Sequence, residues 1–149
     1  MKVRPMRLDD VPQVAAIEAA SFVLPWTAES LAAEVSDNAL ARYFCLEMDG
    51  QVCAYMGVWL IFEEAHVTNV AVREDCRRQG WGEFLFRRVI AEIIPLGICK
   101  MTLEVRESNG AARGLYQKLG FKAEGVRPGY YNDNREDAII MWADLAPQP

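Results

Sequence analysis

Two side chains in the C-terminal half are suited to moving protons. Glu104 stands near the carboxyl end of an expected strand, 100–105, in which Met101, Leu103 and Val105 form one apolar face. Successive side chains of a strand point to opposite faces, so Glu104 points away from that apolar face. An acid in this position is a candidate general base. An exposed carboxylate where a strand leaves the core is an equally good interpretation.

Tyr116 is the second candidate and lies in an expected helix that ends near residue 119. A phenol has an ordinary pKa near ~10, so it keeps its proton at neutral pH and can give it to a departing thiolate. The neighbouring Leu115 and Leu119 favour a tyrosine at the edge of the core instead. Asn109, at the start of the same helix, is explained equally well as a helix cap.

A third feature is the stretch from Asn69 to Gly82, which contains an apolar strand, a basic turn and two glycines one residue apart before a helix. Unpaired N–H groups at a helix N-terminus bind phosphate, and arginines beside them strengthen the site. We therefore predict a polyphosphate-bearing cofactor. The turn is not a P-loop, because Glu83 and Phe84 stand where a P-loop has a lysine and a hydroxyl residue. It is not a typical dinucleotide-binding turn, because Leu85 stands where that turn has its third glycine.

Composition limits the class of protein. With 149 residues, 52% of them hydrophobic and 25% charged, the chain is predicted to form one domain, 1–149, of a soluble globular protein. No signal peptide or membrane span is predicted, which favours the cytoplasm. The net charge of −5 argues against nucleic acid and suits a cationic substrate. Four cysteines and one histidine do not form a zinc set, so we expect no metal and buried free thiols.

The patterning predicts an α/β domain with alternating elements. Strands are expected near 3–6, 41–47, 52–62, 66–72, 100–105, 121–126 and 138–145. Helices are expected from Asp9 or Asp10 to Ser21, after Thr27, over 80–94 and from Asn109 to Leu119. Asp49-Gly50 predicts a hairpin, and Glu63–Ala65 is expected to be the next connection. A helix separates strands 66–72 and 100–105, which predicts that they run parallel, with the phosphate turn at their carboxyl end.

Taken together, these motifs resemble those of the GCN5-related N-acetyltransferases (GNAT). The resemblance rests on Val70-Ala71-Val72, on Arg77, Gly80 and Gly82, on Leu103-Glu104-Val105, on Asn109 and on Leu115–Phe121. Phe22-x-x-Pro25-Trp26 and Tyr130–Asp133 make the chain similar to the ribosomal-protein alanine N-acetyltransferases of that family. The resemblance implies a mixed, mostly antiparallel sheet of about seven strands, with a splayed parallel pair at the cofactor site and about four flanking helices.

The resemblance also implies roles for individual residues. Acetyl-CoA would be the co-substrate, its pantetheine arm pairing with Val70, Ala71 and Val72 and its thioester end lying near Asn109. The pyrophosphate would be held by Arg77, Arg78, Gln79, Gly80, Trp81 and Gly82. Glu104 would be the proton acceptor and Tyr116 the proton donor. Phe22, Pro25, Trp26, Tyr130 and Tyr131 would line the groove for the acceptor.

The implied substrate is a protein N-terminus, specifically the N-terminal alanine of a small-subunit ribosomal protein. At pH 7 an α-amine costs about 1 kcal/mol to deprotonate and a lysine about 4.6 kcal/mol, so a carboxylate base suits a chain terminus. Two alternatives remain: acetylation of a small free amine, and a non-catalytic protein that binds acyl-CoA. We expect no nucleic-acid or membrane partner, and a monomer or weak oligomer.

Overall fold

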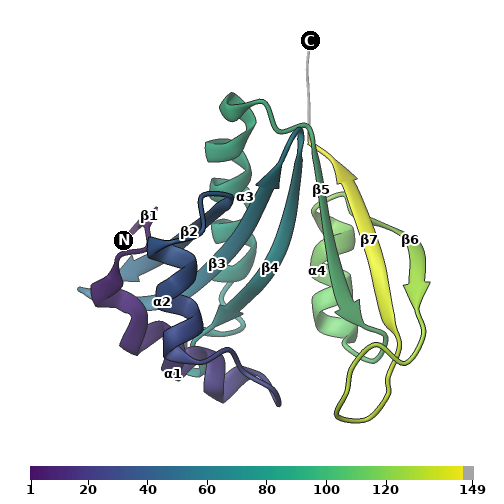
Figure 1. The fold of residues 1–149 in the computed structure, drawn as a ribbon, viewed down its shortest axis with the longest axis horizontal. Helices are drawn as coiled ribbons and strands as arrows, with labels where there is room; N and C mark the ends of the chain where they lie inside the picture. Colours follow the sequence, from purple (N-terminus) through teal and green to yellow (C-terminus); the bar gives the residue numbers. More distant parts are fainter. Residues whose placement is uncertain (146–149) are drawn as a thin grey trace.

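The computed structural model describes residues 1–145, which contain seven strands and four α-helices (Figure 1). The strands are β1 (Lys2–Pro5), β2 (Ala41–Met48), β3 (Gln51–Ile61), β4 (Glu64–Val72), β5 (Lys100–Arg106), β6 (Lys122–Arg127) and β7 (Ala138–Asp144). The helices are α1 (Val11–Ser21), α2 (Ala28–Ser36), α3 (Trp81–Ile93) and α4 (Gly110–Lys118). Each expected element is present, with ends that differ by a few residues.

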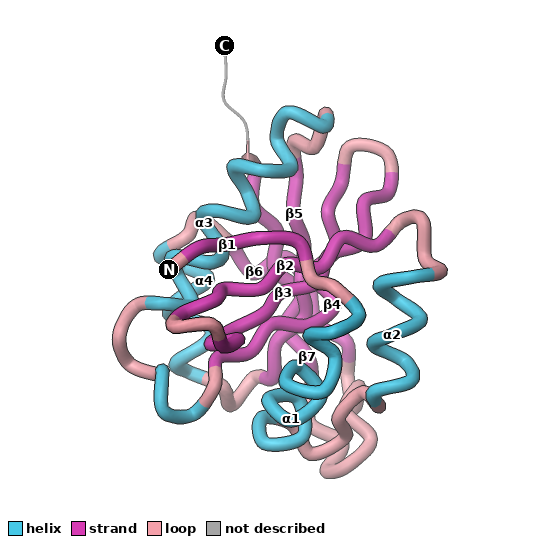
Figure 2. The backbone as a smooth tube through the Cα atoms, turned by 90° about the vertical axis from the view of Figure 1, so that its left-hand side faces the viewer, coloured by secondary structure: helices cyan, strands magenta, loops and turns pink. Residues whose placement is uncertain are grey.

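All seven strands belong to one sheet, in the order β1-β2-β3-β4-β5-β7-β6. Only β4 and β5 pair in parallel, and the other five pairings are antiparallel. Helices α1 and α2 lie on one side of the sheet and α3 and α4 on the other (Figure 2). The predicted fold, a mixed sheet with one parallel pair between two layers of helices, is confirmed.

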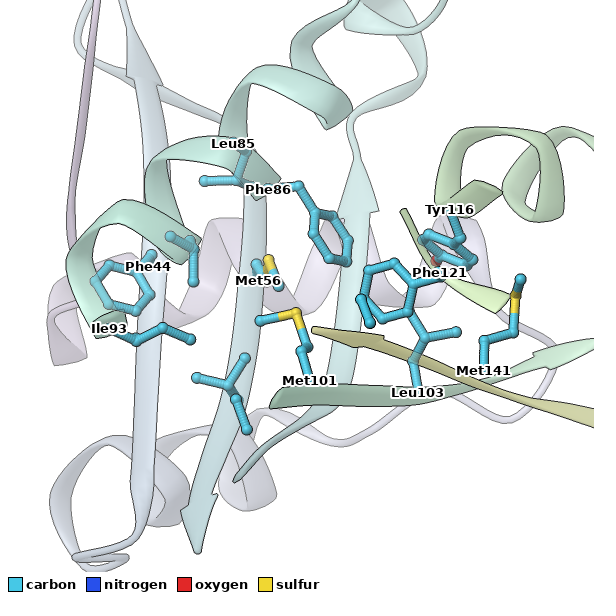
Figure 3. Close-up of a cluster of buried hydrophobic side chains, with 14 of the residues drawn as sticks. Phe44, Met56, Leu85, Phe86, Ile93, Met101, Leu103, Tyr116, Phe121 and Met141 are labelled. Carbon is cyan, nitrogen blue, oxygen red and sulfur yellow. The ribbon is translucent and has the colours of Figure 1, made fainter. Parts of the chain in front are cut away.

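The two faces of the sheet bury separate apolar clusters. Under α3 and α4 the larger cluster contains the α3 residues Leu85, Phe86, Val89 and Ile93 together with side chains of β3, β5 and β7 (Figure 3). Under α1 and α2 the smaller cluster contains Val11, Val14, Ile17 and Leu31. Both helix faces agree with the periodicity of the sequence. The sheet therefore has two distinct sides, and a residue's position in the alternation decides which one it faces.

The two hairpin turns differ in how well the sequence predicts them. Asp49 and Gly50 both have positive φ, 52° and 77°, as a two-residue turn between twisted strands requires, so this prediction is confirmed. The following connection is Phe62–Glu63, and the expectation of Glu63–Ala65 is wrong. The β3–β4 ladder continues to the pair Ile61↔Glu64, which leaves two residues for the turn.

The N-terminal cap also differs from expectation. A short 3-10 turn, Leu8–Asp10, precedes α1, and the Asp10 side chain makes no capping bond to α1. Its carboxylate instead accepts the N–H of Arg7 at 2.7 Å and two hydrogen bonds from the Arg4 guanidinium at 2.7 and 2.9 Å. Arg4 also donates to Glu47 on β2. Asp10 therefore ties the start of α1 to the edge of the sheet.

All four cysteines are free thiols. Cys45 and Cys53 are buried as predicted, whereas Cys76 and Cys99 are half-buried, so the expectation of burial is wrong for these two. Among residues 1–145, no helix is long and apolar enough to cross a membrane.

Candidate active site

The central feature of the site is a divergence between the two parallel strands. Strands β4 and β5 pair only at Glu64↔Lys100, Ala65↔Met101 and His66↔Thr102. Beyond this point β4 continues to Val72, and β5 follows β7 along its whole length (Figure 1). From Val67 onward the β5-facing edge of β4 has no strand partner among residues 1–145, so its backbone groups are available to an extended ligand.

A β-bulge on β4 adjoins the divergence. Val58 of β3 pairs with Val67, but Gly57 pairs with Asn69, so Thr68 is an extra residue on β4. Both Thr68 and Asn69 reach the phenol of Tyr43 on β2, at 3.1 and 2.9 Å. The bulge therefore turns two consecutive polar side chains toward the face covered by α1 and α2.

Tyr43 belongs to a polar cluster that sequence analysis did not find. Its hydroxyl donates to Oε1 of Glu34 on α2 at 3.2 Å, and the indole N–H of Trp59 donates to the same oxygen at 2.6 Å. The Tyr43 ring lies across Gly57, where a Cβ would be 2.4 Å from two ring carbons. A glycine inside an apolar strand indicates such a close approach, and this signal was present in the sequence.

The glycine turn has the predicted geometry. Gly80 is the N-cap of α3 with a φ of 84°. Within the part of the chain that the structure describes, no side chain caps the helix and a Cβ at Gly80 would meet no atom within 4 Å, so the turn is open. The first N–H groups of a helix have no partner within it, so those of α3 are available to an anion. Arg78, Gln79 and Gly80 are exposed, and Trp81 and Gly82 are half-buried.

Arg77 is placed differently from the rest of the turn. Its guanidinium donates to the carbonyl of Val72 at 2.9 Å and to the hydroxyl of Ser21 at 3.0 Å. These contacts join the end of β4 to the end of α1, so in this structure the Arg77 side chain stabilises the conformation of the turn. Cys76, one residue earlier, has its sulfur 3.6 Å from a carboxylate oxygen of Asp75.

Glu104 lies near the carboxyl end of β5, as the sequence predicts. It is half-buried, and its neighbours Leu103 and Val105 are in the core. Its carboxylate forms an ion pair with Arg127 at the end of β6. It also lies close to the phenol of Tyr130, whose pKa is raised first by burial and then by the Glu104 charge. Sequence analysis missed Arg127 because β7, from a later part of the chain, lies between β5 and β6.

Tyr116 is buried, with 8% of its surface exposed, and packs against Phe86 and Phe121 at ring-centroid distances of 5.6 and 5.9 Å (Figure 3). Burial raises the pKa of its phenol to about 12, with a smaller contribution from Tyr131. The interpretation of Tyr116 as a residue of the core is therefore correct for its ring. Its hydroxyl keeps its proton far above neutral pH.

Tyr131 connects the surroundings of both candidate proton carriers. Burial raises its pKa to about 12, which the Arg106 charge opposes and the Glu104 charge increases. The Arg106 guanidinium lies 4.0 Å from the centre of the Tyr131 ring and donates to both carboxylate oxygens of Asp133 at 3.0 Å. Arg106 at the end of β5 thus holds the β6–β7 loop beside the site.

The loop between α1 and α2 is exposed and apolar. Phe22, Val23 and Leu24 have 41%, 68% and 62% of their surfaces exposed, and Trp26 packs partly against the smaller core cluster. The loop is anchored by Glu18, which is 2% exposed and accepts the backbone N–H of Trp26 at 3.0 Å and the hydroxyl of Tyr55.

Two further predictions concern the start of α4 and a possible metal site. The Asn109 side chain accepts the N–H of Ala112 at 3.1 Å, so the predicted cap is confirmed. Within the described residues, no group of three or more histidine, cysteine or acidic side chains is arranged to hold a metal ion.

Comparison with known proteins places the chain among acetyltransferases. The model of the acetyltransferase (GNAT) family matches residues 11–121. A Bacillus subtilis (strain 168) protein, provisionally named a ribosomal protein bS18-alanine N-acetyltransferase, is 43% identical over 96% of this chain and 95% of its own. The ribosomal protein bS18-alanine N-acetyltransferase of Escherichia coli (strain K12) is 37% identical over 89% of both chains. The crystal structure of the ribosomal-protein-S18-alanine N-acetyltransferase from Escherichia coli superimposes with a TM-score of 0.90, covering 99% of this chain and 96% of that one at 33% identity.

The family match covers most of the chain, and the divergent β4–β5 pair with an open glycine turn is the geometry that the sequence motifs predict. This chain therefore belongs to the GNAT family of acetyltransferases.

Proposed function

We propose that this protein transfers the acetyl group of acetyl-CoA to the N-terminal α-amino group of a protein, specifically the N-terminal alanine of the small-subunit ribosomal protein bS18. The Bacillus subtilis and Escherichia coli relatives named for this activity align with 96% and 89% of the chain, which supports the substrate. The observation that carries the chemistry is the divergence of β4 and β5 after His66↔Thr102, with Glu104 two residues further along β5.

The residues present fit acetyl-CoA as co-substrate. The free edge of β4 at Val70–Val72 offers backbone groups to the amides of the pantetheine arm. The uncapped start of α3, with Gly80 open to solvent, offers N–H groups to the pyrophosphate. Arg78, Gln79, Trp81 and Gly82 complete that turn, Arg77 shapes it, and Asn109 lies at the start of α4 near the thioester end.

Glu104 and Tyr116 carry the two proton transfers. The neutral amine attacks the thioester carbonyl, a C–N bond forms and the C–S bond breaks. Glu104 accepts the proton that the nitrogen loses, and Tyr116 protonates the leaving thiolate. Holding the amine and the thioester in one cleft supplies much of the acceleration. A backbone N–H of the bulged strand, such as that of Val70, stabilises the developing oxyanion.

The acceptor enters on the face covered by α1 and α2. Phe22, Pro25 and Trp26 form one side of its groove, and Tyr130 and Tyr131 form the other. Glu104 faces this groove, because its position in the strand alternation is opposite to that of the buried Leu103 and Val105. An α-amine needs about 1 kcal/mol to lose its proton at pH 7, which is within the range of a carboxylate base.

The proposal is tested by supplying acetyl-CoA with three acceptors and measuring products by mass spectrometry. The acceptors are an alanine-initiated peptide, the same peptide with a blocked α-amine and an internal lysine, and spermidine. We expect acetylation of the first at its α-amine and little of the others. Modification of spermidine alone would make the protein a small-amine acetyltransferase. Calorimetric binding of the coenzyme without turnover of any amine would make it a non-catalytic acyl-CoA-binding protein.

A further inference from the structure

A row of aromatic side chains crosses the sheet next to Glu104. The strand registers place Trp59, His66, Thr102 and Trp142 directly opposite one another on β3, β4, β5 and β7. Cross-strand partners share a face of the sheet. The rings of His66 and Trp142 meet edge to face, with centroids 6.2 Å apart. We call these four residues the aromatic row.

The aromatic row faces away from the larger core. The neighbouring residues Ala65, Met101 and Met141 are buried under α3 and α4, so the row faces the side of α1 and α2. On that side α1 packs on β3 and β4, and α2 packs on β2 (Figure 2). Trp59, His66 and Trp142 stay half-buried, and 38% of the His66 side chain is exposed. Trp59 packs partly against the cluster under α1 and α2, so the accessible aromatic surface is the exposed part of these three side chains.

Two carboxylates flank the β3–β4 end of the row. Glu34 accepts the Trp59 indole N–H at 2.6 Å and the Asn38 amide at 2.8 Å. Glu64 lies 3.0 Å from the imidazole of His66, with 37% of its side chain exposed. Among the ion pairs of residues 1–145, neither carboxylate has a lysine or arginine partner. Exposed Lys100 on β5 lies directly opposite Glu64, with Asp144 of β7 on its other side, and exposed Lys122 on β6 stands at the far end of the row. Three carboxylates and two lysines therefore border the row, and the charges next to Trp59 and His66 are those of Glu34 and Glu64.

The aromatic row is continuous with the candidate catalytic site. Thr102 lies two residues before Glu104 on the same face of β5, a separation of about 7 Å along a strand. An extended polypeptide advances about 3.3 Å per residue. A chain whose terminal amine lies at Glu104 therefore reaches the row within its second to fourth residues.

We propose that the aromatic row, with Glu34 and Glu64, binds a lysine or arginine side chain in the second to fourth residues of the acceptor polypeptide. This inference rests on the proposed function, because it takes a polypeptide as the acceptor. A cation is attracted to the face of an indole and to a nearby carboxylate, and the alkyl part of lysine or arginine packs on the aromatic surface. The net charge of −5 attracts such a segment from a distance.

The test compares two alanine-initiated peptides that are identical except for lysine or glutamine at positions two to four. For the parent protein we expect kcat/KM to be about five- to tenfold higher on the lysine peptide, the sum of an exposed ion pair and a cation–π contact. Glu64→Gln should reduce this ratio about two- to fivefold. Glu63→Gln is the matched control, since its side chain is exposed in the adjoining turn, and should keep the ratio and the activity of the parent protein.

The outcomes separate this inference from the proposed function. A charge reversal, Glu64→Lys, should lower the ratio further and favour a peptide with glutamate at the same positions. Two results would overturn the aromatic row as a binding surface and leave the proposed function intact. One is an equal kcat/KM of the parent protein on the lysine and glutamine peptides. The other is a ratio that stays unchanged in both Glu64 variants while their melting temperatures are also unchanged. Failure to acetylate either peptide would overturn both.

Discussion

Replacing Gly57 by alanine tests how the bulge and the polar cluster beneath α2 are built. An alanine Cβ would lie 2.4 Å from Cε2 and Cζ of Tyr43 and 2.9 Å from the Asn69 side-chain oxygen. Contacts this short do not persist, so the Tyr43 ring must move away from the sheet. The hydroxyl at the tip of that ring bonds Glu34, Thr68 and Asn69, and it cannot keep these partners after such a shift.

The expected loss of stability has two parts. Over-packing a filled site costs about 1–3 kcal/mol, and a buried hydroxyl that loses its partners costs about 1–3 kcal/mol more. The two overlap where the ring movement relieves the clash, so we expect a total of about 2–4 kcal/mol. For a chain of this length that corresponds to a melting temperature lower by about 5–15 °C. Activity should fall as well, because Thr68 and Asn69 adjoin the divergence of β4 and β5.

Urea unfolding measures this loss against a glycine in another strand. A Cβ at Gly125 on β6 would lie 3.4 Å from Cδ1 and 3.8 Å from Cβ of Ile140, which are ordinary van der Waals distances, so Gly125→Ala should change the unfolding free energy by less than about 1 kcal/mol. In a Tyr43→Leu background the Gly57→Ala penalty should shrink by at least about 1 kcal/mol, because the obstructing ring is gone. If the unfolding free energy of Gly57→Ala lay within about 0.5 kcal/mol of that of the parent protein, the Tyr43 ring would not obstruct a side chain at position 57.

Three further predictions concern proton transfer and acid stability. Glu104→Gln should lower kcat at least about tenfold while calorimetry finds coenzyme affinity unchanged, and normal turnover would remove Glu104 from the mechanism. Tyr116→Phe should lower kcat with little change in melting temperature, because burial and the Tyr131 charge, and no hydrogen bond within residues 1–145, account for the raised pKa of its hydroxyl; a large loss of stability would contradict this. The hydrogen bonds from Arg4 lower the pKa of Asp10, so the stability they contribute is complete above the ordinary carboxylate pKa and is lost as the pH falls through the depressed value. Asp10→Asn should therefore cost about 2–3 kcal/mol at pH 7, as measured by urea unfolding, and progressively less as the pH falls below the ordinary carboxylate pKa.

The sequence predicts well those features that depend on neighbouring residues. The Asp49-Gly50 hairpin, the Asn109 cap and the glycine turn before α3 each follow from a few adjacent residue types, and the structure has all three. The parallel direction of β4 and β5 follows from the intervening helix. Each of these depends on local geometry, which a short segment specifies by itself.

Features that depend on strand order were missed. The ion pair of Glu104 with Arg127 and the contact of Arg106 with Asp133 join residues separated by more than twenty positions. Both exist because β7 inserts between β5 and β6, an order that the chain does not display locally. The buried Glu18 of α1 was missed because one of its partners, Tyr55, lies on β3, and the other is the backbone of Trp26 in a loop. Pairing across a sheet must be known before these contacts can be predicted.

The bulge on β4 is the exception, because its signal lies within one strand. The residues that pack on the larger core are Ala65, Val67, Val70 and Val72, so the spacing changes from two to three and back to two. A strand with regular alternation would instead place Asn69 in the core and Val70 on the opposite face. The extra residue, Thr68, prevents this and keeps apolar side chains under α3.

The same extra residue gives a physical reason for the divergence of the parallel strands. Pairing with β5 ends at His66, two positions before Thr68. A bulge increases the local twist of its strand and interrupts the even spacing of its backbone groups. β5 has no matching insertion along its ladder with β7, so it cannot follow the altered course of β4 and stays with β7. The free edge of β4 is thus a consequence of one residue between two apolar pairs, and the polar cluster around Tyr43 holds that residue in place.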